Sequence, residues 1–257
     1  MQRMSTIFAT VNQKGGVGKT TTAVNLASYL ATFGKKILLI DSDPQGNATS
    51  GLGVDRNDIT ACMYDVIING ADISSIIKPT SISGLEIAPA TPRLAGAEVE
   101  LTEIEGRESK LKNALMAIRH RYDYLLIDCP PSLSLLTVNA LTATDQVIIP
   151  IQCEYYALEG LSQLVKTIEL IKKSLNPDLR ICGILLTMYD SRTLLSEQVV
   201  EETRRHFGGK VFKTIIPRNV RLAEAPSFGQ PIVFYDPSSS GAVAYESLSR
   251  EVLDGHI

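Results

Sequence analysis

Apolar runs of strand length alternate along the chain with longer stretches whose apolar residues recur every three to four positions. The short runs are nearly continuous in valine, isoleucine and leucine, which is typical of parallel strands buried on both faces of a sheet. Strands are therefore predicted within residues 6–12, 35–41, 84–90, 122–132, 145–152, 180–190 and 210–218.

The longer stretches predict helices between these strands. They cover residues 20–34, 108–122, 158–175 and 195–208, and a short helix and a C-terminal helix follow the last strand. Strands that alternate with helices predict a three-layer α/β/α fold with a mostly parallel central sheet and right-handed crossovers. No internal repeat or long linker divides the chain, so we predict one domain over residues 1–257.

The stretch VNQKGGVGKTTT, residues 11–22, joins the first predicted strand to the first predicted helix. This is the position of a phosphate-binding loop, whose usual pattern is G-x-x-x-x-G-K-[ST]. Glycines let backbone N–H groups approach phosphate oxygens, and the helix N-terminus attracts the same negative charge. We predict that this loop binds a nucleotide through Gly15, Gly16, Val17, Gly18, Lys19, Thr20 and Thr21.

Within the loop, Lys19 is placed to reach the β- and γ-phosphates, Thr20 to bind Mg²⁺ and Thr21 to touch the α-phosphate. The loop departs from the usual pattern because Gln13 stands where a glycine is expected, next to a second lysine, Lys14. A phosphate loop needs only one lysine, so the pattern alone leaves the purpose of Lys14 open.

Three carboxylates follow predicted strands. Asp41 ends the run LLID and Asp43 comes two residues later, while Asp128 ends the run YLLID. Ligands of open α/β sheets bind at the carboxyl ends of the strands, so these side chains are expected beside the γ-phosphate. We predict that Asp43 orients the attacking water, that Asp41 holds the water shell of the metal, and that Asp128 binds Mg²⁺ through water.

The segment TIIPRNVRLAEAPSFGQPI follows the last predicted strand and should lie at the same edge. Pro217, Arg218 and Asn219 are therefore candidates to frame the base of the nucleotide, although the segment alone is simply a loop.

Composition limits the remaining function classes. The net charge is −3, so any nucleic-acid binding must come from a local patch. The four scattered cysteines form no C-x-x-C pair and are expected to be buried, reduced thiols. No signal peptide is apparent, and no apolar run approaches the roughly 18 residues that a membrane span requires.

With these motifs assembled, the sequence resembles the deviant-Walker-A ATPases of the MinD/ParA superfamily, and among them the ParA/Soj chromosome-partitioning ATPases. The resemblance runs from Ile7 to about Tyr245. It is carried by KGGVGKTTT, LLIDSDPQGNATSGLG, YDYLLIDCPPSLSLLTVNAL, PIQCEYYALEGLSQL and IIPRNVRLAEAPSFGQPI, the last two being the most specific.

The resemblance implies a cytoplasmic, nucleoid-associated ATPase that uses ATP and Mg²⁺. ATP would drive a homodimer in which Lys14 reaches the phosphates of the partner subunit, and Asp43 would be needed for hydrolysis. The dimer would bind double-stranded DNA without sequence preference, with Arg192 and Arg221 at the DNA. A ParB-like protein would stimulate hydrolysis and release the dimer, and residues 217–219 would form the adenine-side loop.

From Arg180 onward the chain holds nine Lys/Arg and nine Asp/Glu, so a DNA-binding patch requires that the cations be segregated from the acids. We expect a patch formed by Arg192, Arg204, Arg205, Lys210, Lys213, Arg218 and Arg221.

Three alternatives share the phosphate loop. A nitrogenase-iron-protein-like reductase needs two cluster-bridging cysteines per subunit, and only Cys129 lies near a nucleotide motif. A MinD-like membrane ATPase wants a basic amphipathic C-terminal helix, which ESLSREVLDGHI does not supply. An autorepressing plasmid ParA needs an N-terminal helix-turn-helix domain, and six residues precede Ile7. Colourless protein after anaerobic purification and no ATP-dependent liposome sedimentation would exclude the first two.

Overall fold

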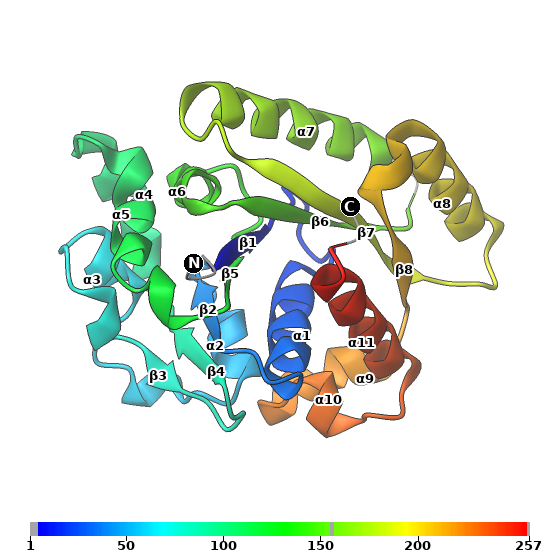
Figure 1. Ribbon diagram of the computed structural model, residues 1–257, viewed down its shortest axis with the longest axis horizontal. Helices are drawn as coiled ribbons and strands as arrows, with labels where there is room; N and C mark the ends of the chain where they lie inside the picture. Colours follow the sequence, from blue (N-terminus) through cyan, green and yellow to red (C-terminus); the bar gives the residue numbers. More distant parts are fainter. Residues whose placement is uncertain (1–4, 155–156, 256–257) are drawn as a thin grey trace.

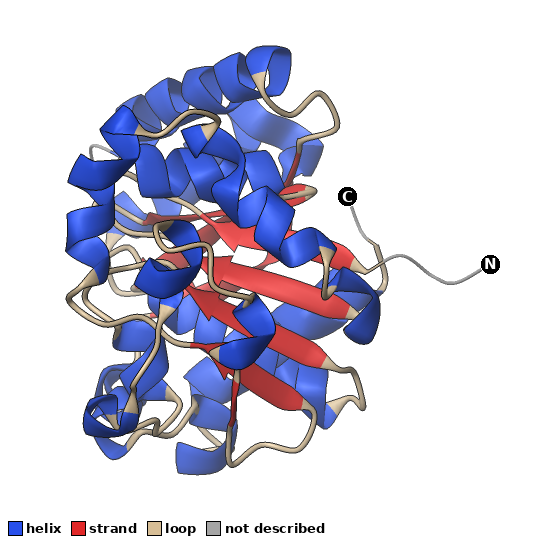
Figure 2. Ribbon diagram, turned by 90° about the vertical axis from the view of Figure 1, so that its left-hand side faces the viewer, coloured by secondary structure: helices blue, strands red, loops and turns tan. Residues whose placement is uncertain are grey.

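The computed structural model describes residues 5–154 and 157–255, in which helices cover both faces of one central sheet (Figures 1 and 2). The strands are β1 (Thr6–Thr10), β2 (Ile37–Asp41), β3 (Lys78–Pro79), β4 (Leu85–Ala88), β5 (Tyr124–Asp128), β6 (Gln146–Gln152), β7 (Arg180–Tyr189) and β8 (Val211–Pro217). The α-helices are α1 (Lys19–Thr32), α2 (Asn47–Gly51), α3 (Met63–Ile67), α4 (Leu94–Glu100), α5 (Lys110–Met116), α6 (Leu135–Ala143), α7 (Ala157–Ser174), α8 (Leu194–Phe207), α9 (Val220–Glu224), α10 (Ile232–Tyr235) and α11 (Ser240–Leu253).

The sheet has eight strands in the order β3-β4-β2-β5-β1-β6-β7-β8. All neighbours pair in parallel except β3, a two-residue edge strand that runs antiparallel to β4. The predicted three-layer fold with a mostly parallel sheet is therefore confirmed.

Two hydrophobic cores lie on the two faces of the sheet because successive side chains of a strand point in opposite directions. Ile7 and Ala9 of β1 pack into one core, which includes residues of α3 to α8, whereas Phe8 packs into the other, with residues of α1, α2, α10 and α11. Both faces are thus covered, which is why the central strands lack alternating polar residues. The four cysteines are buried and free, as expected.

One helix prediction needs correction, and several helices were not predicted. The predicted helix over residues 108–122 is broken: α5 ends at Met116, and a separate 3₁₀ turn, Arg119–Arg121, follows it. In that turn the Arg119 guanidinium donates to the Ser5 carbonyl and the Asp145 carboxylate, so tertiary contacts redirect the chain. Helix α6 was not predicted, because nearly every face of it is buried and it shows no amphipathic period.

The segment between β2 and α3 contains α2 and packs against the segment after α9. The 3₁₀ helix η7 (Ala225–Phe228) ends at Gly229, and a Cβ atom at Gly229 would lie only 2.7 Å from the Cα of Gly53. Both glycines have positive φ, so side chains are excluded there by space and by conformation. No helix in the described part of the chain is long and apolar enough to cross a membrane.

Candidate functional site

The carboxyl ends of three central strands bring the predicted acidic residues together. Asp128 at the end of β5 pairs in register with Asp41 of β2 on one side and with Thr10 of β1 on the other. Parallel pairing places these ends at one edge of the sheet, where α/β proteins bind their ligands. The structure therefore places Asp41 and Asp128 side by side at this edge, and their roles stay predictions.

The phosphate loop connects β1 to α1 at this edge. Gly16 and Gly18 adopt left-handed conformations, with φ of 74° and 89°, which side chains rarely accept. Gly18 is also the N-cap of α1, and no side chain caps this end. Backbone N–H groups at the start of the helix are consequently free to bind an anion such as a phosphate.

The two lysines of the loop have different environments. Lys19 is 6% exposed, and its ammonium group donates to the Lys14 carbonyl at 3.1 Å, so it lies across its own loop. Burial lowers the pKa of Lys19, and the nearby Asp128 opposes that effect. The side chain of Lys14 is instead half exposed and forms an ion pair with Glu154 at 2.8 Å. Only Lys19 is therefore held over the loop of its own subunit.

The residues predicted to hold the metal form an oxygen-rich contact. The Thr20 hydroxyl donates to Asp128 at 2.7 Å, and Asp128 also accepts a longer bond from Thr10. Hydroxyl and carboxylate oxygens suit Mg²⁺, which commonly takes few protein ligands and completes its shell with water and phosphate. The described residues contain no cluster of three or more His, Cys, Asp or Glu placed to hold a metal.

Asp41 is engaged differently from the sequence prediction. One of its oxygens accepts from both the backbone N–H and the hydroxyl of Thr49, at 2.8 and 2.7 Å, and the other accepts from the Asp43 N–H. Thr49 in turn accepts from the Ala90 N–H. Asp41 therefore anchors α2 and the turn that carries Asp43, and its contact with the water shell of a metal stays a prediction.

Asp43 lies in a tight turn directly after β2. Its Oδ1 accepts from the Gln45 N–H at 2.9 Å, which fixes the orientation of a side chain that is only 6% exposed. The two carboxylates beside it are buried, and burial raises the pKa of Asp128 to about 8 and that of Asp41 to about 6. Charge repulsion acts in the same direction: Asp41 and Asp43 raise the pKa of Asp128, and Asp43 raises that of Asp41.

Raising the pH from about 5 to about 8 is expected to destabilise the nucleotide-free protein through Asp128. Because its folded-state pKa lies above that of the unfolded chain, the folded protein holds a proton that the unfolded protein has released. Thermal midpoints measured across this range should fall more steeply for the wild type than for Asp128→Asn, which has no titrating group there. Equal slopes would contradict the inferred protonation.

A pocket of about 450 Å³ lies beside the phosphate loop. Its lining includes Gly18 and Thr21 from the loop, Met188 from β7, and the segment Pro217–Asn219. The structure thus brings the predicted base-framing residues next to the predicted phosphate-binding residues. Its walls are mostly apolar, as the faces of a nucleotide base require.

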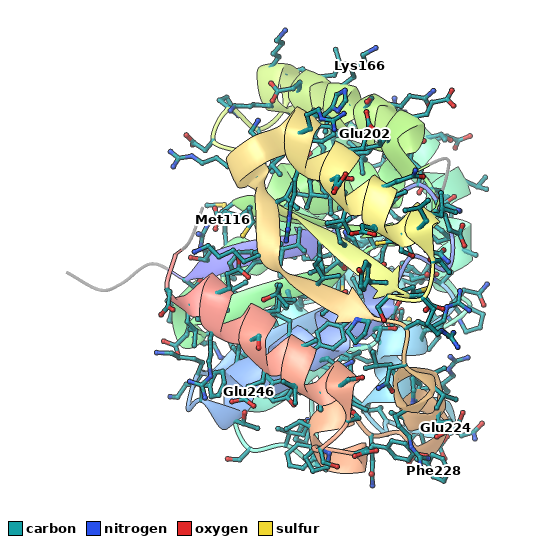
Figure 3. The ribbon with its side chains drawn as sticks, turned by 90° about the vertical axis from the view of Figure 1, so that its right-hand side faces the viewer. Met116, Lys166, Glu202, Glu224, Phe228 and Glu246 are labelled. Atoms are coloured by element: carbon teal, nitrogen blue, oxygen red, sulfur yellow. The ribbon has the colours of Figure 1, made fainter. Side chains whose placement is uncertain are left out.

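The two arginines predicted at the DNA are not separated from acids, and this part of the sequence prediction is wrong. Arg192 forms a two-pronged contact with Asp190, at 2.8 and 2.7 Å. Arg221 pairs with Glu224 at 2.9 Å and lies 3.5 Å from Asp236. Figure 3, which views the molecule from the right-hand side of Figure 1, shows Glu224, the partner of Arg221, next to Phe228. Any phosphate must therefore compete with carboxylates for these guanidinium groups.

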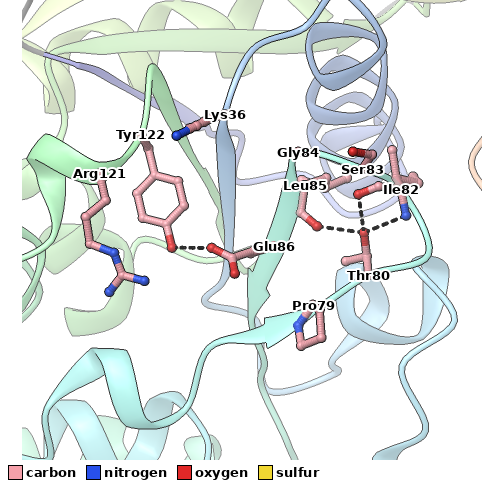
Figure 4. A pocket seen from close by; sticks show the side chains of 10 residues that line it. All are labelled: Lys36, Pro79, Thr80, Ile82, Ser83, Gly84, Leu85, Glu86, Arg121 and Tyr122. Atoms are coloured by element: carbon pink, nitrogen blue, oxygen red, sulfur yellow. Dashed lines mark hydrogen bonds between the residues drawn. The ribbon is translucent and has the colours of Figure 1, made fainter.

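A larger pocket, of about 600 Å³, lies at the opposite end of the sheet (Figure 4). It is lined by Lys36, which precedes β2, by Tyr122, which precedes β5, and by the start of β4. The Tyr122 hydroxyl donates to Glu86 at 2.6 Å, a contact that joins the β4 edge of the sheet to its centre. None of the predicted site residues lines this cavity, so size does not identify the nucleotide site.

Three residues make contacts within the site that the sequence did not indicate. Thr49 holds Asp41, Glu154 pairs with Lys14, and Thr187 places its hydroxyl within hydrogen-bond distance of the carbonyls of Val17 and Ile151. The sequence offers one signal for Thr187: it lies near the end of β7, and the carboxyl ends of parallel strands form the edge of the sheet where ligands bind.

Comparison with known proteins identifies the family. A model of the AAA domain family AAA_31 matches residues 5–181. The sporulation initiation inhibitor protein Soj of Bacillus subtilis is 59% identical over 249 residues, which cover 97% of this chain and 98% of that protein. The chromosome partitioning protein ParA of Myxococcus xanthus is 56% identical, with coverage of 96% and 87%.

Solved structures agree with the fold and the ligands. A Mycobacterium smegmatis protein described as a cobyrinic acid a,c-diamide synthase, with a bound ATP analogue and magnesium, is 37% identical, with a TM-score of 0.85 and coverage of 97% and 94%. A putative plasmid partition protein of Borrelia burgdorferi bound to AMPPNP is 26% identical, with a TM-score of 0.83 and coverage of 97% and 99%.

The phosphate loop, the threonine–carboxylate pair at its base and the extent of these similarities lead to one conclusion. The chain belongs to the ParA/Soj family of chromosome-partitioning P-loop ATPases, enzymes that bind and hydrolyse ATP with Mg²⁺.

Proposed function

We propose that this protein is an ATP-switched partition ATPase that binds double-stranded DNA as a dimer. Two ATP-bound subunits join face to face, the dimer holds DNA without sequence preference, and a ParB-like protein stimulates hydrolysis and so releases it. This proposal explains why the chain needs more than one lysine in its phosphate loop.

The observation that carries the proposal is the pair of lysines. Lys19 already lies over its own loop, whereas Lys14 is half exposed and pairs with Glu154. Exposed ion pairs contribute little free energy, so an incoming phosphate can displace Glu154. Once released from Glu154, the Lys14 ammonium group is available to bind the phosphates of a nucleotide in a second subunit.

In each subunit the phosphates lie against Gly15–Thr21 and the base lies beside Pro217–Asn219. Thr20 and Asp128 hold Mg²⁺, which neutralises the charge that develops on the phosphates. Asp43 orients the attacking water, and its turn is kept in place by Asp41 and Gln45. Bound Mg²⁺ favours the ionised form of Asp128, because the cation offsets the cost of burying its charge.

Dimerisation provides the switch for DNA binding. A single subunit that contacts few phosphates binds DNA weakly and in a salt-sensitive way. A dimer doubles the contacts and gains avidity without any change at the DNA-binding surface itself. DNA retention measured with ATP, with ADP and without nucleotide, across a salt series, tests this directly. Equal retention under the three conditions would contradict the switch.

Replacing Arg192 or Arg221 by alanine is expected to weaken DNA retention while leaving ATP-dependent dimers intact. Each substitution removes one cation per subunit, two per dimer, so the slope of log affinity against log salt should become shallower by about 2. Asp190→Asn should have the opposite effect, because it frees Arg192 from the carboxylate that now competes with phosphate.

Arg250→Ala is the matched control, because it removes an exposed cation that likewise pairs with a carboxylate, Glu246, on α11. Its retention should equal that of the wild type. If all the arginine variants behave alike, the DNA effect is one of net charge, and the assignment of Arg192 and Arg221 is wrong.

A further inference from the structure

Met188 has an unusual backbone conformation. It is the only non-glycine residue in the described part of the chain with a positive φ, 52°. A side chain in this region is strained and persists only where the surrounding structure imposes it. Glycine would adopt the same conformation without strain. A methionine here therefore indicates that the side chain itself is needed.

The strain coincides with a bulge in the sheet. Leu186 of β7 pairs with Ile215 of β8, and Tyr189 pairs with Pro217, so three steps along β7 oppose two along β8. One extra residue therefore lies on β7 between these pairs. Bulges of this kind change the direction of a side chain and are frequent beside active sites.

The bulge is tied to the phosphate loop and to the segment after β8. The Thr187 hydroxyl lies 2.9 Å from the carbonyl of Val17, in the loop. On the other side of Met188, the Arg218 N–H donates to the Tyr189 carbonyl at 2.8 Å. Met188 is thus held between the residues that bind phosphate and those placed beside the base.

Met188 lines the 450 Å³ pocket, together with Pro217, Val220 and Leu222. This apolar wall adjoins Gly18 and Thr21, so a nucleotide whose phosphates lie on the loop can place its base in the pocket. A methionine thioether makes favourable contacts with aromatic rings, and its flexible chain adapts to their shape.

We propose that Met188 positions the nucleotide: the bulge directs its thioether against the purine ring of ATP. The proposal rests on the placement of the base beside Pro217–Asn219 given above, and it is independent of DNA binding and of the partner protein.

The test compares a ligand that has a base with one that has none. Met188→Gly and Met188→Ala are titrated with Mg²⁺ and either ATP or inorganic tripolyphosphate, which occupies the phosphate loop only. We expect the Kd for ATP to rise about three- to tenfold, the size of a lost sulphur–aromatic contact. The Kd for tripolyphosphate should stay unchanged. Met188→Leu, which keeps an apolar side chain, should restore most of the affinity for ATP.

Two results would overturn the proposal: unchanged ATP affinity in the glycine and alanine variants, or an equal loss for ATP and tripolyphosphate, which would indicate damage to the loop. The thermal midpoint of Met188→Gly should not fall, because glycine relieves the strain.

Ala223→Phe separates this inference from the placement of the base. Ala223 also lines the pocket, and a phenyl ring there would fill it. If Ala223→Phe weakens ATP but the Met188 variants do not, the pocket holds the base and the assignment of Met188 is wrong. If Ala223→Phe also leaves ATP affinity unchanged, the base lies elsewhere and both assignments fail.

Discussion

Asp43→Ala is expected to reduce ATP hydrolysis by about 100-fold or more while ATP binding is retained, the range typical of removing a group that directs a proton or an attacking water. Asp43 is held in place by the Gln45 N–H and lies directly after β2, at the edge that carries the phosphate loop. Without hydrolysis, the ATP dimer should accumulate on DNA. The measurements are phosphate release and DNA retention after ATP is removed.

Two variants make this experiment specific. Asp43→Asn keeps the size of the side chain and its acceptor for Gln45 but has no carboxylate charge, so it should be as inactive as alanine. Asp55→Ala removes an exposed acid whose carboxylate accepts hydrogen bonds from Asn57, and it should hydrolyse ATP normally. Normal hydrolysis by Asp43→Asn would show that the carboxylate is not the group that matters.

Lys14→Ala is expected to abolish ATP-dependent dimers while each subunit still binds ATP. The side chain is half exposed and contacts Glu154 rather than its own loop. Losing a charged contact to a buried phosphate costs about 2 kcal/mol or more, and a symmetric dimer loses two of them. The dimer dissociation constant should therefore rise roughly 1000-fold, because each 1.4 kcal/mol is a factor of ten.

Light scattering in the presence of ATP measures this, and binding of a fluorescent ATP analogue shows whether the site itself survives. Lys36→Ala is the control, because it removes the same charge from the opposite end of the sheet. Lys19→Ala should instead lose ATP binding, since Lys19 lies over the loop of its own subunit. Normal dimers of Lys14→Ala would refute a role across the subunit interface.

Much of the fold was predictable because its signals are local. Continuous apolar runs predicted the parallel strands, and a glycine-rich stretch between a strand and a helix predicted the phosphate loop. The failures occurred where tertiary contacts override such signals. Arg119 turns the chain away from a helix by its contacts with Ser5 and Asp145, and α6 is too fully buried to show an amphipathic pattern.

The residues of the site also fall into those that local sequence signals predict and those that depend on tertiary contacts. The sequence was sufficient to name Gly18, Lys19, Thr20 and the carboxylates at the strand ends. The first three belong to one short motif, and the carboxylates lie together because parallel strands end at the same edge of the sheet. The carboxylates that neutralise Arg192 and Arg221 were misjudged. Charge counting cannot show which acid a flexible guanidinium contacts, and one of the acids near Arg221, Asp236, is fifteen positions away.

By itself, the sequence determined seven of the strands, the phosphate loop and the presence of a second lysine within it, because these depend on residues that are close together in the chain. Only the tertiary structure decided that Lys14 pairs with Glu154, that Asp41 accepts hydrogen bonds from Thr49, and that Met188 lines a pocket beside the phosphate loop. Each of these depends on how separate segments pack, and packing is settled by the whole molecule rather than by any one stretch.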